Sequence, residues 1–201
     1  NIKGIISPES REKIKASSQA VEKIVSKGQP VYGINTGFGP LCTTMISPEQ
    51  TKKLQENLLK SHAVGLGEPI PIEISKLMLV LKTHALAQGF SGIQESTLDR
   101  ILFFIENNIV PVVPKQGSVG ASGDLAPLSH LFLPLIGLGK VHFKGEIIST
   151  AKLFQHLDLE PIHLGPKEGL ALINGTQAST ALALKGLVLA RRVFEAALVA
   201  V

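Results

Sequence analysis

The sequence predicts a mainly α-helical fold, and three observations lead to that prediction. Apolar residues recur at helical spacing through much of the chain, and Ser-Pro pairs that start helices occur at residues 7–8 and 47–48. In addition, 44% of the 201 residues are apolar and only 18% are charged. We therefore expect a well-buried helical bundle that covers part of its apolar surface with another subunit or with further chain.

The first two helices are predicted from their caps. Ser7 and Pro8 supply a cap and a first-turn proline, and Gly28 ends the first helix. Residues 47–50, SPEQ, form a capping box that starts the second helix. The expected inward stripes are Ile14, Val21 and Ile24 in the first helix, and Leu54, Leu58 and His62 in the second.

Two further helices and two extended segments follow. One helix is expected over residues 72–88, and the next is expected to start at Ser96, with Asp99 in the box position. Residues 110–114, VPVVP, must be extended because two prolines forbid a regular helix. Residues 140–148 alternate around a Lys-Gly pair and predict a small β-hairpin. The inward residues of the 72–88 helix are expected to be Ile74, Leu77, Met78, Leu81 and Ala85.

The last segment, residues 178–201, predicts a long Ala- and Leu-rich helix that is apolar on most faces, so we expect it to be buried in a bundle. No repeat or linker indicates an internal domain boundary. The chain begins without Met and ends inside a helical run. We therefore expect residues 1–201 to be one portion of a protein, truncated at both ends.

Bulk properties argue against several partners. The net charge is +4, but the basic residues are scattered among acids, so we expect no nucleic-acid binding. Cys42 is the single cysteine, which favours a reducing cytoplasm. The most apolar stretch, residues 125–138, is too short and too broken to span a bilayer. The six histidines show no metal-ligand spacing, so we expect no metal site.

Residues 117–124, GSVGASGD, form a glycine-rich loop before an apolar helix that Asp124 could cap. The loop lacks the Gly-Lys-Ser/Thr of a phosphate-binding loop and the Gly-x-Ser-x-Gly of a nucleophile elbow. A third chemistry is autocatalytic cyclisation, in which the Gly123 nitrogen attacks the Ala121 carbonyl carbon and Ser122 loses water. The product is a methylidene-imidazolone ring with an electron-poor carbon. By themselves, these residues also fit an ordinary flexible loop.

Residues 117–130, GSVGASGDLAPLSH, resemble the signature of the histidine and phenylalanine ammonia-lyase family almost letter for letter. The resemblance implies that Ala121, Ser122 and Gly123 form the methylidene-imidazolone cofactor. It also implies a helical homotetramer whose sites combine several subunits, with no metal or nucleotide. Leu125 lies in the same block and is expected to contact substrate.

Residues 31–39, VYGINTGFG, are similar to a second block of this family, in which the tyrosine removes the substrate's β-proton. The resemblance makes Tyr32 the candidate base and places Gly39 beside the substrate. A phenol with a pKa of about 10 needs nearby positive charge or helix N-termini to act as a base at neutral pH. Without the resemblance, Tyr32 would be interpreted as a structural aromatic residue.

Two more blocks carry the resemblance. Residues 57–65 are similar to the histidine-specific branch, which has Ser-His where this chain has Ser61 and His62. An imidazole there suits a polar substrate ring, whereas a lone histidine on a helix stripe is more often a core residue. Residues 170–176 resemble the block whose asparagine, here Asn174, contacts the ring. An isolated Asn-Gly pair would only indicate a turn.

The resemblance therefore implies non-oxidative deamination of L-histidine to trans-urocanate and ammonia in the whole enzyme. We expect the 201-residue piece alone to be inactive, because the segment that binds the substrate carboxylate in relatives has no counterpart here. A lyase for phenylalanine or tyrosine, or an aminomutase, shares every block. A serine hydrolase using Ser122 with Asp158 and His163, or a non-catalytic helical fragment, is a more distant alternative.

Overall fold

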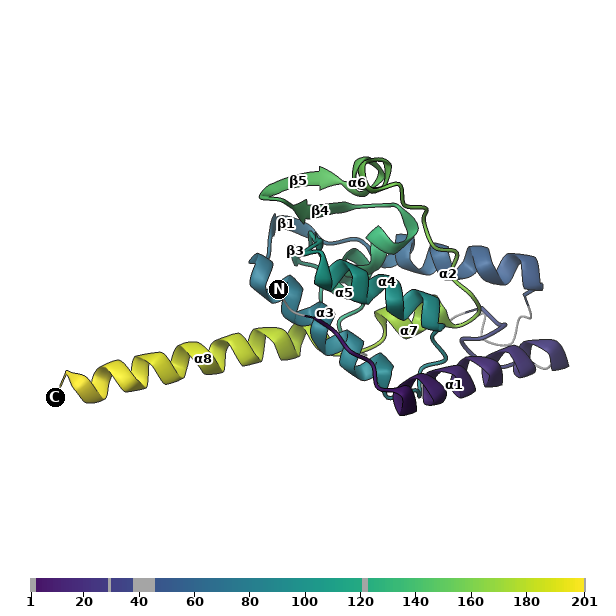
Figure 1. The fold of residues 1–201 in the computed structure, drawn as a ribbon, viewed down its shortest axis with the longest axis horizontal. Coiled ribbons are helices and arrows are strands. Elements are labelled where there is room, and N and C mark those ends of the chain that lie inside the picture. The colour runs from purple at the N-terminus through teal and green to yellow at the C-terminus, as the bar shows by residue number, and fades with distance from the viewer. Residues whose placement is uncertain (1–2, 29, 38–45, 121–122, 201) are drawn as a thin grey trace.

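A computed structural model describes residues 3–28, 30–37, 46–120 and 123–200 as a helical body with one long projecting helix (Figure 1). The mainly α-helical prediction is confirmed. The helices are α1 (Pro8–Lys27), α2 (Pro48–His62), α3 (Ile72–Ala87), α4 (Glu95–Glu106), α5 (Leu125–Phe132), η2 (Leu133–Ile136), α6 (Thr150–Leu157), α7 (Glu168–Ile173) and α8 (Gln177–Val199).

The predicted caps of α1 and α2 are confirmed. The Ser7 hydroxyl accepts the Ser10 N–H at 3.1 Å, and the Ser47 hydroxyl accepts the Gln50 N–H at 3.3 Å. Gly28 ends α1 with a φ of 64°, a left-handed conformation that glycine adopts without strain. Local sequence signals were sufficient here because cap and helix are neighbours in the chain.

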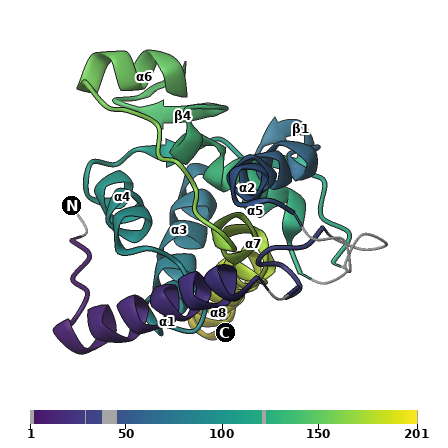
Figure 2. The ribbon, with the colours of Figure 1, turned by 90° about the vertical axis from the view of Figure 1, so that its right-hand side faces the viewer.

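Helix α3 runs through the centre of the body, with α1, α4, α5 and α8 around it (Figure 2). Ile74 and Met78 are buried as predicted, whereas Leu77, Leu81 and Ala85 are only partly buried. Because neighbours pack on several sides, the buried surface is wider than one stripe. It also includes Leu79, Lys82, Thr83, Leu86 and Ala87.

The predicted start of α4 is wrong. The helix begins at Glu95 after Gln94, not at Ser96, and Gln94 makes no side-chain cap bond. The backbone N–H of Gln94 instead donates to the Glu168 carboxylate at 3.0 Å. A residue 74 positions away thus holds the start of this helix, which no local pattern reveals. Asp99 does not close a capping box but pairs with Arg11 at 2.9 Å.

Two small antiparallel sheets flank the helices. The predicted hairpin is confirmed as β4 (Lys140–Phe143) and β5 (Glu146–Ser149), and β2 (Val110–Pro111) adds a third strand beside β4. The second sheet pairs β1 (Leu66–Pro69) with β3 (Pro114–Gln116). The segment around residues 110–114 is therefore extended, as its prolines require.

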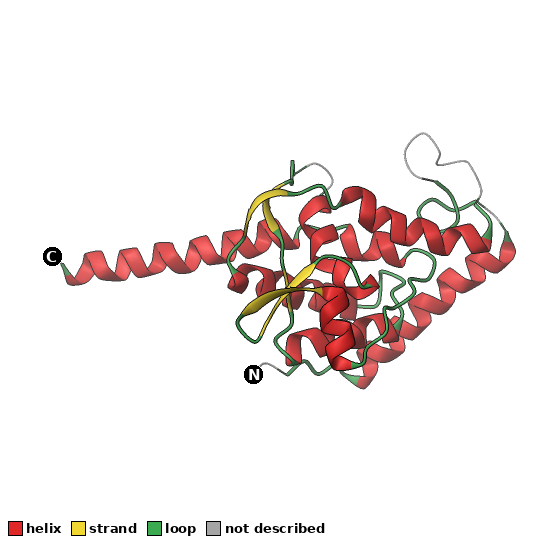
Figure 3. Cartoon of the chain, turned by 90° about the horizontal axis from the view of Figure 1, so that it is seen from above, coloured by secondary structure: helices red, strands yellow, loops and turns green. Residues whose placement is uncertain are grey.

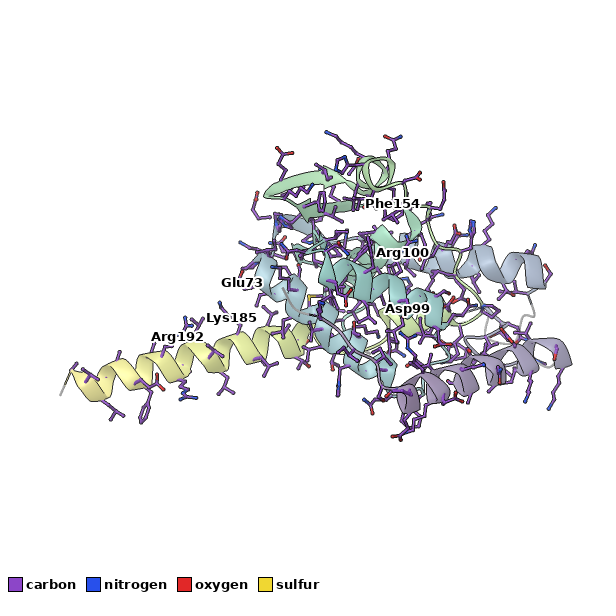
Figure 4. The ribbon with its side chains drawn as sticks, in the orientation of Figure 1. Glu73, Asp99, Arg100, Phe154, Lys185 and Arg192 are labelled. Atoms are coloured by element: carbon purple, nitrogen blue, oxygen red, sulfur yellow. The ribbon has the colours of Figure 1, made fainter. Side chains whose placement is uncertain are left out.

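Helix α8 leaves the body and projects away from it (Figures 1 and 3). The predicted helix is confirmed, but its predicted burial is wrong for the described part of the chain, where only Ala178 and Ala181 of α8 are buried. At its base, Lys185 pairs with Glu73 of α3 at 3.2 Å (Figure 4). Beyond that point the exposed apolar side chains include Leu187, Val193, Phe194 and Leu198.

Candidate active site

A small cavity of about 190 Å³ lies where the end of α2 meets the glycine-rich loop and the start of α5. It brings together three of the predicted site residues, His62, Gly123 and Leu125. A larger cavity of about 580 Å³, between α3 and α8, contains none of the predicted site residues. The other lining residues of the small cavity are Ser61, Val64, Gly117, Ser118, Val119 and Ala126.

His62 is the last residue of α2 and is half-buried. Its Nδ1 atom lies 2.9 Å from the Leu58 carbonyl oxygen and 3.1 Å from the Ser61 hydroxyl. A carbonyl oxygen only accepts, so Nδ1 must carry the proton when the ring is neutral. Nε2 is then an acceptor.

Gly123 ends the loop in a conformation that requires glycine. Its φ is +102°, and a Cβ atom built on it would collide with the carbonyl oxygen of Gly175. The next residue, Asp124, donates its backbone N–H to that same Gly175 oxygen at 2.8 Å. The loop therefore ends directly against the turn that connects α7 to α8.

Asp124 precedes α5, yet its carboxylate does not cap α5 as predicted. It accepts the backbone N–H and the hydroxyl of Ser179, each at 2.7 Å, near the start of α8. Its other neighbour is the Ser118 hydroxyl at 3.2 Å. The buried Asp124 thus caps α8 and also joins both ends of the glycine-rich loop.

Asn174 ends α7, with an exposed side chain, and its carbonyl oxygen accepts a hydrogen bond from Lys82 Nζ at 2.8 Å. Lys82 is only 2% exposed, and burial, together with the nearby Lys167, lowers its pKa to about 8. No sequence motif singled out Lys82 as a site residue. Its spacing of four and eight residues from Met78 and Ile74 places it on the inward stripe, which was a usable signal.

His130 on α5 was also missed. Its Nε2 atom accepts the Gly65 N–H at 2.9 Å, and burial lowers its pKa. A Cβ atom on Gly65 would lie 3.0 Å from His130 Nε2 and 3.1 Å from the Gln116 carbonyl oxygen. The segment just after His62 is therefore held closely against α5 and β3.

Of the remaining predicted residues that the structure describes, Tyr32 and Asn174 do not line this cavity. Tyr32 lies after α1, is 58% exposed and does not line the cavity. Its turn is held by the Asn35 side chain, which accepts the Val31 N–H at 2.8 Å. Gly39, Ala121 and Ser122 lie outside the described residues.

The arrangement gives no support to a hydrolytic triad. His163 is 86% exposed, and its nearest acidic partner is Glu56 at 3.9 Å, whereas Asp158 lines a different cavity. Across the described ranges, no group of three or more His, Cys, Asp or Glu side chains could hold a metal ion. Within those same ranges, no helix has the length and apolar character needed to cross a membrane.

Comparison with known proteins places this geometry in context. A family model described as aromatic amino acid lyase matches residues 1–201. The chain is 51% identical over 183 residues to histidine ammonia-lyase of Symbiobacterium thermophilum, covering 91% of this chain and 36% of the relative.

Solved structures agree. Histidine ammonia-lyase from Trypanosoma cruzi superposes with a TM-score of 0.87 at 41% identity, covering 95% of this chain and 37% of that one. Phenylalanine aminomutase of Pantoea agglomerans gives 0.91 at 28% identity, covering 98% and 38%. The chain thus spans little more than a third of the length of these relatives.

Proposed function

Because this chain belongs to the aromatic amino acid lyase family, we propose that it forms the cofactor-bearing part of an enzyme that converts L-histidine to trans-urocanate and ammonia. The observation that carries the choice of substrate is His62, held at the cavity with its Nε2 as an acceptor. The name of the relative that is 51% identical, histidine ammonia-lyase, supports the same choice.

The described residues fit a cofactor formed from Ala121, Ser122 and Gly123. Cyclisation needs a glycine nitrogen in a tight turn, and Gly123 has a positive φ and no room for a Cβ atom. Asp124 and Ser118 tie the two ends of the loop together. Once formed, the methylidene-imidazolone ring supplies an electrophilic carbon that accepts the substrate amine.

In this proposal, His62 selects the substrate. Its Nε2 accepts an N–H from the substrate imidazole, while the Leu58 carbonyl and Ser61 fix the ring's orientation. A phenyl ring has no N–H to offer, so binding phenylalanine would leave the acceptor unpaired. Leu125, on the same cavity wall, gives the substrate an apolar contact.

Asn174 and Tyr32 have separate roles in this proposal, charge stabilisation for Asn174 and proton removal for Tyr32. The Asn174 amide would donate to the ring oxygen and stabilise negative charge on it. Tyr32 removes the β-proton, and Gly39 lies beside the substrate. The roles of Tyr32 and Gly39 rest on the family match and the VYGINTGFG block, since the cavity lining does not include them.

We extend the proposal to assembly and compartment. The exposed apolar side chains of α8 favour self-association, and the family resemblance implies a homotetramer whose sites combine residues from several subunits. The single cysteine favours the cytoplasm. The segment that binds the substrate carboxylate is expected from the rest of the polypeptide.

The test is substrate turnover by the full-length polypeptide that carries these residues. We expect the purified protein to form urocanate from L-histidine, seen by ultraviolet absorbance, and to prefer histidine over phenylalanine. His62→Phe should lower histidine turnover on the order of 100-fold or more, because the polar partner of the substrate ring is lost. Val64→Ala, on the same cavity wall, is the matched control and should keep most of the activity.

The outcome that contradicts the proposal is a protein that leaves histidine unchanged, or one whose His62→Phe variant turns it over normally. Product analysis decides between this reaction and the second candidate, an aminomutase, because phenylalanine aminomutase of Pantoea agglomerans shares the fold of this chain with a TM-score of 0.91. A β-amino acid in place of urocanate would establish that candidate.

A further inference from the structure

The buried cation Lys82 has no ionic partner that would explain its position. Its side chain comes from the middle of α3, is 2% exposed, and pairs with no carboxylate among the described residues. The charge that further lowers its pKa is another cation, that of Lys167. Burying an ammonium group in this way costs stability, and its pKa is lowered accordingly.

What Lys82 does contact is the backbone of the candidate active site. Its Nζ atom donates to the Asn174 carbonyl oxygen at 2.8 Å. The next carbonyl in the chain, that of Gly175, accepts the Asp124 N–H and lies against Gly123. One peptide unit therefore separates the lysine contact from the carbonyl that holds the end of the glycine-rich loop.

The turn needs such a contact because glycine makes it pliable. Gly175 has no Cβ atom, so its backbone restrains the two peptide planes beside it less than another residue would. Asp124 and Ser179 fix the α8 side of the turn. Within the described residues, Lys82 is the side chain that fixes the Asn174 side.

We propose that Lys82 is a positioning residue for this site, an inference that rests on the proposed function. By holding the Asn174 carbonyl, it fixes the direction in which the Asn174 side chain leaves the backbone. Through Gly175 it also fixes the backbone at Gly123 and Asp124. The burial of Lys82 therefore serves to position the site and does not stabilise the core.

The test compares Lys82→Met with Lys167→Met in the full-length polypeptide. Lys167 is a matched control because it is a partly buried lysine with a lowered pKa that donates to a backbone carbonyl, that of Ser91, at 2.6 Å. Three readouts are taken on each: hydrogen exchange of the Asp124 amide, the melting temperature, and kcat and KM for histidine. Lys82→Arg is the conservative rescue.

In Lys82→Met we expect the Asp124 amide to exchange about tenfold faster while amides of α4 are unchanged. We expect kcat to fall by about tenfold to 100-fold with KM nearly constant, because the site is displaced but not removed. The melting temperature should stay equal or rise, since an unpaired buried cation is gone. Lys82→Arg should restore most of kcat, and Lys167→Met should show none of the local effects.

The proposal is overturned if Lys82→Met exchanges at Asp124 like the wild type, or if Lys167→Met produces the same local change. A general loss of melting temperature with faster exchange throughout would also overturn it, since that indicates a core role. If Lys82→Met fails to fold, Lys82→Gln is measured in its place, because its side chain is too short to keep the bond from the lysine ammonium to the Asn174 carbonyl. The same acceleration of exchange at Asp124 is then expected. Accelerated exchange in a protein that does not turn over histidine would contradict the proposed function alone.

Discussion

His130 shows how one backbone amide sets the protonation state of a side chain at the site. Its Nε2 accepts the Gly65 N–H, so this nitrogen must be unprotonated for the contact to exist. Burial lowers the pKa of His130 below its ordinary value of 6.5. The contact anchors the segment that follows His62, so this protonation state affects the wall of the proposed substrate cavity.

A dependence of stability on pH follows. The folded protein binds fewer protons at His130 than the unfolded chain between its lowered pKa and about 6.5. The stabilisation is therefore complete above about 6.5 and is lost as the pH falls through that window. His130→Gln keeps an acceptor but does not titrate. We expect it to be less stable than the wild type above about pH 6.5, and we expect the difference in free energy of unfolding between the two proteins to shrink as the pH falls.

Urea unfolding of both proteins at several pH values measures this difference. His142 also has a pKa lowered by burial and titrates in the same window, but its contribution cancels because both proteins contain it. A difference that stays constant across the pH range would refute this role for His130.

At the residue scale, the sequence predicted the site residues that lie within recognisable local motifs. His62 was identified from one block and Gly123 and Leu125 from another, and the fold brings all three to one cavity. The sequence did not predict the hydrogen bond between Lys82 and Asn174 or the one between Gly65 and His130, because the two residues of each pair lie 92 and 65 positions apart. The placement of Tyr32 next to a substrate stays a prediction.

At the scale of elements, Glu168 joins two segments far apart in sequence. It is 1% exposed, and its carboxylate accepts the Gln94 N–H at 3.0 Å and the Gly165 N–H at 2.7 Å. These bonds connect the start of α4 to the loop before α7. Burial raises the pKa of this carboxyl group, while the backbone donors oppose that shift.

Glu168→Ala should destabilise the fold by about 3 kcal/mol, because two backbone N–H groups lose their acceptor in a buried place. Chemical denaturation measures the free energy of unfolding directly. Glu12→Ala, at an exposed position on α1, removes the same chemical group and should stay within about 0.5 kcal/mol of the wild type. Equal effects from the two substitutions would disprove the bridging role.

Helix starts were predictable wherever the cap is local and failed where it is remote. Ser7 and Ser47 cap the helices that follow them, as their sequence patterns indicate. The start of α4 and the target of the Asp124 carboxylate depend instead on Glu168 and on Ser179. Propensity and capping rules describe neighbours in the chain and carry no information about these partners.

At the scale of the whole molecule, α8 is the feature that the described chain leaves uncovered. Its outer part carries Phe194 at 62% exposure and Val193 at 70%. Arg192 lies on the same projecting part of the helix (Figure 4). The composition predicted apolar surface that another subunit or further chain would cover, and α8 exposes such a surface. Its cover stays a prediction, and composition does not identify the element that supplies the surface.

We expect the 201-residue chain to self-associate through this surface. Phe194→Glu should shift the association to higher protein concentration, because it puts a charge on the apolar face. Analytical ultracentrifugation over a concentration series measures the shift. Arg192→Ala changes the net charge by the same amount and is the matched control. Unaltered association in Phe194→Glu, or an equal loss in Arg192→Ala, would rule out this surface.

The central claim is that residues 121–123 cyclise into the cofactor, and the intact mass of the full-length polypeptide tests it most directly. Cyclisation with loss of the serine hydroxyl removes two waters, about 36 Da. The account predicts that wild-type protein is lighter than its encoded mass by this amount. It also predicts that Gly123→Ala, whose Cβ atom has no space beside Gly175, keeps the encoded mass. A wild-type protein at its full encoded mass would contradict the account.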